Sequence, residues 1–287
     1  MSEFPIDRRN GRVAPRGVGR PHLFWPGFFA FVLAAWAALA AMSVGHPGPS
    51  ATLGPGMGIV DRLLGDPGWG AFLENLCTTA AGTLSLPALF GMWALMTLAM
   101  MAPTALPFFS AYRNLVNAKP GAAGVLALPA LVLGYLGVWL AFSFVAATAQ
   151  IALTGAGAVS DAGISTSMKL NAALLLVAGL YQFAPMKRWA LKGCRTPMNF
   201  FLTRWRHGTA GAWTMGLEQG LMCFACCWAL MLLAFAGGTM NLLWMGGAML
   251  VMALEKMPEI GEAISAPLGV FLIYGSVLTG ALAFGLI

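Results

Sequence analysis

Cysteines are concentrated in one apolar stretch of the chain, the segment GLEQGLMCFACCWALMLLAFAGG at positions 216–238. Cys223, Cys226 and Cys227 occur there at helical spacing, so their thiols can approach one another on one side of a helix. Thiolate and thioether sulfurs are preferred ligands of Cu(I), and thiolates also bind zinc. The pattern therefore predicts a site for a soft metal ion, and the methionine-rich surroundings favour Cu(I) over zinc.

The next apolar stretch, positions 240–256, supplies further candidate ligands. The short connection GGTMN before it returns the chain antiparallel and places Met252 and Glu255 opposite the cysteines. Lys256 follows, and we expect it to neutralise a nearby glutamate. A carboxylate inside a membrane costs about 2.5–3.5 kcal/mol, so Glu218 is also a candidate functional residue. The predicted metal ligands are Glu218, Met222, Cys223, Cys226, Cys227, Met252 and Glu255.

The composition predicts a membrane protein. The 287 residues are 59% hydrophobic and only 9% charged, with a mean hydropathy of +0.77, whereas soluble domains carry roughly 25% charged residues. Basic residues are in excess, but no soluble segment combines them with interleaved aromatics. The sequence therefore predicts a lipid bilayer as the surroundings and excludes nucleic acid as a partner.

Long apolar runs predict an all-α, polytopic membrane protein with about seven transmembrane helices. The expected spans are 23–43, 86–109, 125–149, 168–186, 212–236, 240–256 and 266–286. Pro103 and Pro107 should break or kink the second span near its end.

The distribution of basic residues predicts how the chain is oriented. With the N-terminus inside, fourteen of the sixteen Lys and Arg residues fall in cytoplasmic segments. We therefore expect residues 1–22 to be a basic cytoplasmic segment and 23–287 to be a single transmembrane domain. The C-terminus would lie outside, residues 187–211 would form a basic cytoplasmic loop, and the location would be the inner membrane of a bacterial cell.

The residues leave several functions open. Metal delivery, transport or sensing is the leading hypothesis, with other membrane subunits or a metal-delivering protein as partners. A thiol–disulfide oxidoreductase could use Cys223 and Cys226, although a mid-membrane position hinders thiol access. A structural or accessory subunit of a larger complex would suit Gly237, Gly246 and Gly247, which permit close helix packing. We find no phosphate-binding loop, dinucleotide fingerprint or nucleophile elbow, so enzymatic function is not the leading prediction.

Three segments carry a family resemblance: GLEQGLMCFACCWALMLLAFAGGTMNLLWMGGAMLVMALEK, WALMTLAMMAPTALPFFSAYR and GLYQFAPMKRWALKGCRTP. They resemble an uncharacterised prokaryotic family of predicted metal-binding integral membrane proteins, a domain-of-unknown-function family. The resemblance implies functional residues at Cys223, Cys226, Cys227, Met240, Asn241 and Glu255. Family members commonly carry a cysteine pair ending in Cys-Arg-x-Pro in the cytoplasmic loop. Here Cys194 is present but Ala190 replaces its partner, so the resemblance does not imply a loop site built on that pair.

Overall fold

The computed structural model describes residues 24–44, 85–118, 126–160 and 163–285. Apart from one isolated bridge between Val159 and Ser165, the regular structure of these residues is helical. The helices are α1 (Phe24–Val44), α4 (Leu86–Thr104), α5 (Leu106–Ala118), α6 (Ala127–Gly155), α7 (Met168–Gln182), α8 (Pro185–Arg195), α9 (Pro197–Arg204), α10 (Gly208–Leu232), α11 (Ala234–Gly237), α12 (Leu242–Glu255) and α13 (Gly261–Ala283). The all-α prediction is confirmed, while the predicted cytoplasmic segment 1–22 lies outside the described residues.

Five of the described segments are long and apolar enough to cross a bilayer, which indicates a membrane protein. They are Trp25–Ser43, Leu86–Thr104, Ala127–Gly155, Gly208–Gly237 and Gly261–Ala283. The predicted fourth and sixth spans correspond to α7 and α12, which have 15 and 14 residues, fewer than the ~20 that a span needs. The count of seven and the orientation are therefore not confirmed and stay predictions.

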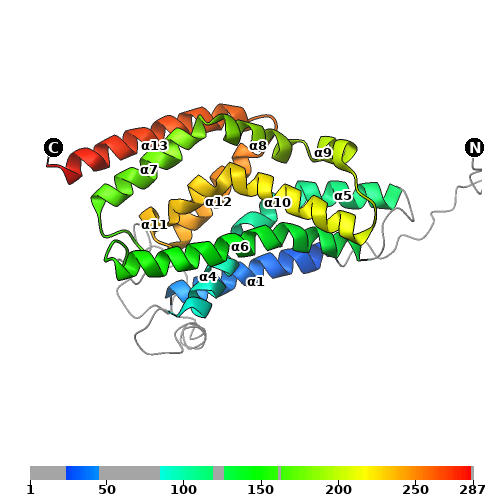
Figure 1. The fold of residues 1–287 in the computed structure, drawn as a ribbon, viewed down its shortest axis with the longest axis horizontal. Coiled ribbons are helices and arrows are strands. Elements are labelled where there is room, and N and C mark those ends of the chain that lie inside the picture. Colours follow the sequence, from blue (N-terminus) through cyan, green and yellow to red (C-terminus); the bar gives the residue numbers. More distant parts are fainter. Residues whose placement is uncertain (1–23, 45–84, 119–125, 161–162, 286–287) are drawn as a thin grey trace, which may run out of the picture.

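The packing of α6 against α10 forms the centre of the bundle, with α7 and α13 paired at one side (Figure 1). Glycines let the two central helices touch backbone to backbone. A Cβ atom at Gly216 would lie 2.1 Å from the Leu131 carbonyl oxygen, and one at Gly134 would lie 2.3 Å from the Trp213 carbonyl oxygen. No side chain larger than hydrogen fits at either position, so α10 is held tightly against α6.

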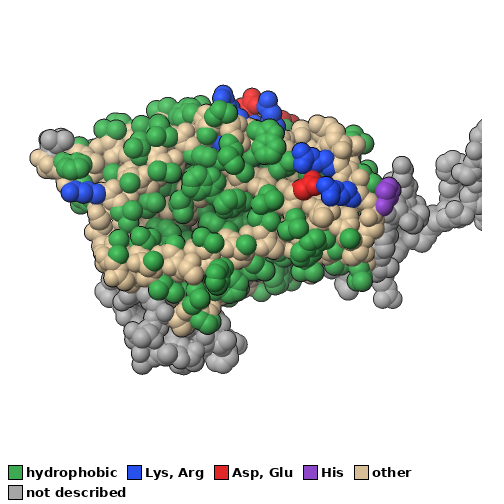
Figure 2. Space-filling view, viewed as in Figure 1, with side chains coloured by type: hydrophobic (Ala, Val, Ile, Leu, Met, Phe, Trp, Pro, Cys, Tyr) green, Lys and Arg blue, Asp and Glu red, His purple; other side chains and the backbone are tan. Residues whose placement is uncertain are grey.

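The surface of the bundle is apolar over a wide area. Figure 2 shows hydrophobic side chains across the visible face and charged side chains gathered in a few places near its margins. On α13, Val270, Phe271 and Tyr274 are exposed by 61%, 71% and 67%. A soluble monomer rarely exposes so large a contiguous apolar surface, so this surface is suited to lipid.

The predicted proline break is confirmed, since α4 ends at Thr104 and α5 begins at Leu106. Pro103 has no N–H to donate, and the carbonyl of Ala99 instead accepts a hydrogen bond from Trp36 Nε1 at 3.1 Å. The Met101 carbonyl accepts from Thr104 Oγ1 at 2.9 Å and from the Tyr135 hydroxyl at 3.2 Å. The Met101 carbonyl next to the break thus holds Thr104 of α4 and Tyr135 of α6 together.

The basic segment 187–211, which we expected to be a loop, is largely helical and contains most of α8, all of α9 and the start of α10. Pro185 and Pro197 each occupy the first position of a helix, where a missing N–H costs nothing. Helix α8 packs against α10, and Gly193 faces the Met222 sulfur so closely that an added Cβ would lie 2.7 Å from it. This contact brings the end of α8 to the cysteines.

Candidate metal centre

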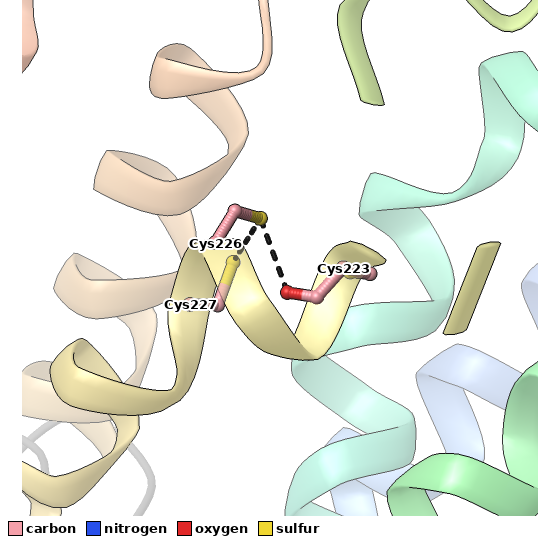
Figure 3. A group of neighbouring side chains, drawn as sticks. All are labelled: Cys223, Cys226 and Cys227. Atoms are coloured by element: carbon pink, nitrogen blue, oxygen red, sulfur yellow. Dashed lines mark hydrogen bonds between the residues drawn. The ribbon is translucent and has the colours of Figure 1, made fainter. Parts of the chain in front are cut away.

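Three thiols of α10 form a compact buried group. The sulfurs of Cys223, Cys226 and Cys227 lie within 4.8 Å of one another, and all three residues are at most 2% exposed. Cys226 donates to the Cys223 carbonyl at 3.1 Å, and the Cys226 and Cys227 sulfurs are 3.1 Å apart (Figure 3). Metal–thiolate bonds of about 2.3 Å allow two ligand sulfurs to be up to about 4.6 Å apart across one ion. One ion can therefore contact these thiols after small side-chain movements.

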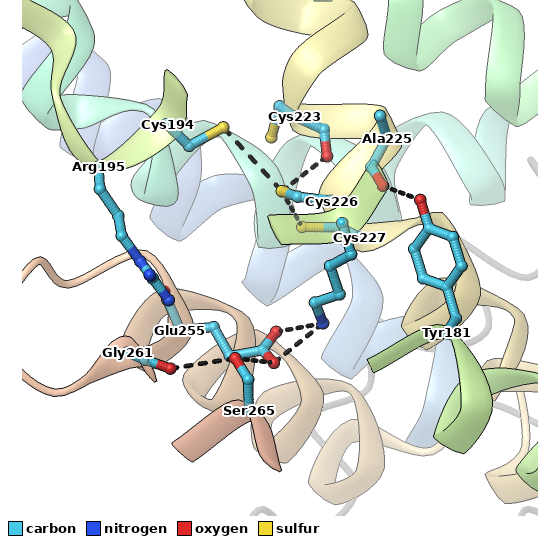
Figure 4. Close-up of polar contacts among 11 residues, drawn as sticks. Tyr181, Cys194, Arg195, Cys223, Ala225, Cys226, Cys227, Glu255, Gly261 and Ser265 are labelled. Atoms are coloured by element: carbon cyan, nitrogen blue, oxygen red, sulfur yellow. Dashed lines mark hydrogen bonds and ion pairs between the residues drawn. The ribbon is translucent and has the colours of Figure 1, made fainter. Parts of the chain in front are cut away.

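A fourth thiol reaches this group from α8. The Cys194 sulfur lies 4.0 Å from the Cys226 sulfur (Figure 4), and Gln219 Nε2 approaches Cys194 at 3.7 Å. Cys194 is half-buried, whereas the other three are buried, and all four are free thiols. The pKa of the Cys194 thiol is raised, chiefly by a hydrogen bond with the Cys223 thiol and also because burial disfavours the thiolate. Metal binding must displace its proton.

A lysine amine lies beside the thiols. Lys256 Nζ donates to the Cys223 sulfur at 3.0 Å and to Thr104 Oγ1 at 2.7 Å. The Tyr135 hydroxyl lies 3.1 Å from the same sulfur. The expectation that Lys256 neutralises a glutamate is wrong, because its ammonium faces a thiol and a hydroxyl. An ammonium in this position offsets negative charge on a thiolate or on a metal–thiolate complex.

Glu255, a predicted ligand, lies in a buried ion pair. Lys187 Nζ donates to both carboxylate oxygens of Glu255, at 2.9 and 2.8 Å, and each side chain is 1% exposed. Ser265 Oγ donates to the same carboxylate at 3.1 Å, and Arg195 Nε donates to the Glu255 backbone carbonyl at 2.9 Å (Figure 4). This carboxylate links the ends of α8, α12 and α13.

Glu218 is held at a different place, by two arginines that follow α8. Arg206 Nη2 lies 2.6 Å from one carboxylate oxygen and Arg204 Nη1 lies 3.2 Å from the other. The Glu218 side chain is 25% exposed. Neither Glu218 nor Glu255 belongs to the thiol group. The structure thus brings three predicted ligands together and gives the two carboxylates cationic partners.

Comparison with known families identifies the kind of protein. A family model described as PpoB2, copper chaperone, matches residues 90–279. The chain belongs to this family. The matched range contains all four thiols and Lys256, and it confirms the resemblance to a family of metal-binding proteins. No curated protein and no solved structure matches the chain. Membership of the copper-chaperone family and the buried cysteine group together indicate metal handling by a helical protein.

The other residues singled out from the sequence lie on α10, on α12 or just before α12. Met222 is 8% exposed and its sulfur faces Gly193 of α8, while Met252 is fully buried. Asn241 begins α12 as its N-cap, where its side chain accepts from the Trp244 N–H at 3.0 Å. Ligation of a metal by Met222 and Met252 stays a prediction, as do the functional roles that the family resemblance implies for Asn241 and the half-buried Met240.

Cys194 was not predicted as a member of the site, and Lys256 was predicted to have a different role. A signal for Cys194 was present, because the residue opens a Cys-Arg-x-Pro motif at the end of α8. Because Ala190 replaces the second cysteine of the family's loop pair, Cys194 was not expected to bind a metal. The structure shows that Cys194 meets the thiols of α10 instead.

Proposed function

We propose that this chain binds one Cu(I) ion through the thiols of Cys194, Cys223, Cys226 and Cys227 and passes it to an acceptor protein. The observation that supports this most strongly is the convergence of four free thiols from two helices in a buried space. Soft thiolate ligands favour Cu(I) and zinc over harder ions such as magnesium and calcium. The copper-chaperone description of the family favours Cu(I) over zinc.

The charge of the surroundings limits how many of the thiols can bind the ion as thiolates. A Cu(I) ion with two thiolates carries one negative charge, which the ammonium of Lys256 balances at 3.0 Å from Cys223. The other nearby ammonium, Lys187, already pairs with Glu255. Four thiolates would give a Cu(I) complex three negative charges and a zinc complex two. Burying negative charge without a partner is costly, so we expect only two of the four thiols to bind the ion as thiolates at one time.

Cys194 is suited to be the first ligand that an incoming ion meets. It is the half-buried member of the four, and it lies on α8, whereas the other three lie on α10. An ion bound to Cys194 can form a bond to Cys226, 4.0 Å away, as its bond to the donor breaks. Each thiol that joins the metal releases its proton to solvent. The same route in reverse would deliver the ion to an acceptor.

The proposed location is the inner membrane of a bacterial cell, with seven crossings and the N-terminus inside. The five long apolar helices support a membrane location. Leu176, Val177 and Leu180 of α7 are exposed by 40%, 45% and 56%, which suits lipid contact for this shorter helix. Under this orientation α8 and the half-buried Cys194 face the cytoplasm, where a metal-delivering protein could reach them.

The test is anaerobic Cu(I) titration of the purified full-length protein against a chromophoric chelator. We expect about one tightly bound ion in the wild type and none in Cys226→Ser with Cys227→Ser. Affinity should rise with pH, by about tenfold per unit for each proton released. Cys77→Ser is the matched control, because Cys77 precedes the family match over residues 90–279 that contains the four proposed ligands. Unchanged copper binding in the double variant would overturn the site, and tight zinc binding without Cu(I) binding would overturn the choice of ion.

A further inference from the structure

A cavity of ≈ 580 Å³ lies where the end of α7, one face of α8 and the start of α13 meet. Its polar lining comes from Gln182, Arg188, Lys192, Arg195, Glu262 and Ser265. None of the four described thiols lines it, because Cys194 points from another face of α8 toward α10. The volume is in the range of sites that hold small molecules or ligand headgroups.

The lining is strongly cationic. Arg188, Lys192 and Arg195 contribute three positive charges against one carboxylate, Glu262. The Arg195 side chain is only 9% exposed, and its nearest carboxylate oxygen, on the 80% exposed Glu262, is 3.5 Å away. Arg195 Nε donates to the Glu255 backbone carbonyl at 2.9 Å, which leaves most of the guanidinium N–H groups free to offset the lost hydration by binding an anion. The cavity therefore favours an anion.

An unpartnered amide in the wall gives an independent indication of a ligand. Gln182 is 3% exposed, and neither its Oε1 nor its Nε2 has a hydrogen-bond partner among the described residues. Leaving a buried amide unpaired is unfavourable. An anion held by Arg195 in this cavity would accept a hydrogen bond from the amide NH₂ group of Gln182.

The walls around these polar groups are apolar and exposed. Phe183 and Trp189 line the same cavity and are exposed by 44% and 57%. The cavity also adjoins the start of α13, a candidate span whose outer face is apolar. Tryptophan and basic residues gather where a membrane meets water. A ligand with a negatively charged head and an apolar tail matches both parts of the wall.

We propose that this cavity binds the phosphate group of an anionic phospholipid. The planar guanidinium of Arg195 presents paired N–H donors to phosphate oxygens, and Lys192 and Arg188 supply further positive charge at the mouth. The acyl chains would lie against the exposed apolar face of α7 and α13. The site is separate from the thiols, so it does not depend on copper binding.

The test is native mass spectrometry of the delipidated full-length protein titrated with phosphatidylglycerol, phosphatidylcholine or inorganic phosphate. We expect phosphatidylglycerol to bind at least about fivefold more tightly than phosphatidylcholine. Lys192→Gln should weaken phosphatidylglycerol binding about fivefold, and adding Arg188→Gln should weaken it about 25-fold. Both side chains are exposed, so folding should not be affected. Arg204→Gln, a matched change of an exposed cation outside the cavity, should leave binding unchanged.

Gln182→Leu separates a binding role from a structural one. If the amide holds the phosphate, this variant weakens phosphatidylglycerol binding while its melting temperature without lipid stays the same or rises. Unchanged lipid binding in Gln182→Leu and in Lys192→Gln would overturn the proposal. Equal binding of both lipids would also overturn it, and binding of inorganic phosphate without any preference for lipid would overturn the lipid assignment.

Discussion

Glu218 and Glu255 are both acidic residues within apolar stretches, and their surroundings differ sharply. Glu255 is 1% exposed and is paired with the equally buried Lys187. Glu218 is 25% exposed and is paired with Arg204 and Arg206, whose side chains are 43% and 53% exposed. Both carboxylates form ion pairs with basic side chains, but only the Glu255 pair is buried.

The comparison shows that a carboxylate in an apolar segment need not be a metal ligand. The oxygens of Glu255 are engaged by Lys187 and Ser265, which join three helices. Those of Glu218 are engaged by Arg204 at the end of α9 and Arg206 just before α10. The ion pair of Glu255 should therefore matter for folding, while that of Glu218 should matter little.

The largest effect is expected from breaking the buried pair. Lys187→Met leaves the Glu255 carboxylate buried without its cation and should lower the free energy of unfolding by about 3–5 kcal/mol. A denaturant titration of the purified protein in detergent measures this loss of unfolding free energy. The double variant Lys187→Met with Glu255→Leu should recover most of the loss. A double variant no more stable than the single one would show that the pair is not the cause.

A smaller effect is expected at Lys256, whose ammonium faces a thiol and not a carboxylate. Lys256→Met removes the charge beside Cys223 and should weaken Cu(I) binding by about 10–100-fold, as is typical for partners of metal ligands. Chelator competition measures the affinity. Lys169→Met, on the exposed start of α7, is the control. An unchanged Cu(I) affinity would show that Lys256 does not stabilise the bound ion.

The smallest effect is expected at Glu218. Glu218→Gln should change stability by at most about 1 kcal/mol, because solvent screens an exposed ion pair. The difference from the wild type should shrink further in 1 M salt, where screening is stronger. Copper stoichiometry should remain the same. Loss of the ion in this variant would instead support Glu218 as a ligand, as the sequence alone predicts.

Most of the helices could be predicted from local patterns, but the short ones could not. The break between α4 and α5 follows from Pro103, because the missing N–H acts within a single turn. A search for ~20-residue apolar runs cannot detect α8 and α9, which have 11 and 8 residues. Such short helices are stabilised by packing against their neighbours, and packing is not visible in a local pattern.

In the candidate site, too, some contacts follow from local sequence spacing and others depend on how the helices pack. Cys223, Cys226 and Cys227 share one helix, so their spacing alone brings the thiols together. Cys194 is 32 positions from Cys226, and Lys187 is 68 positions from Glu255. Both of these contacts depend on how α8 packs against the other helices. Lys256 directly follows Glu255, yet the two side chains reach different partners, because adjacent side chains on a helix point about 100° apart.

The backbone contact between α6 and α10 has a consequence for how an ion would be exchanged. A slide or rotation of α10 would drive the carbonyls of Leu131 and Trp213 into Gly216 and Gly134, so we expect α10 to keep its position against α6. Helix α8 is tied to α12 and α13 by the Lys187–Glu255 pair. The thiol that can change its distance to the others is then that of Cys194, at the end of this eleven-residue helix. The rate of the proposed copper transfer would depend on the movement of that one side chain.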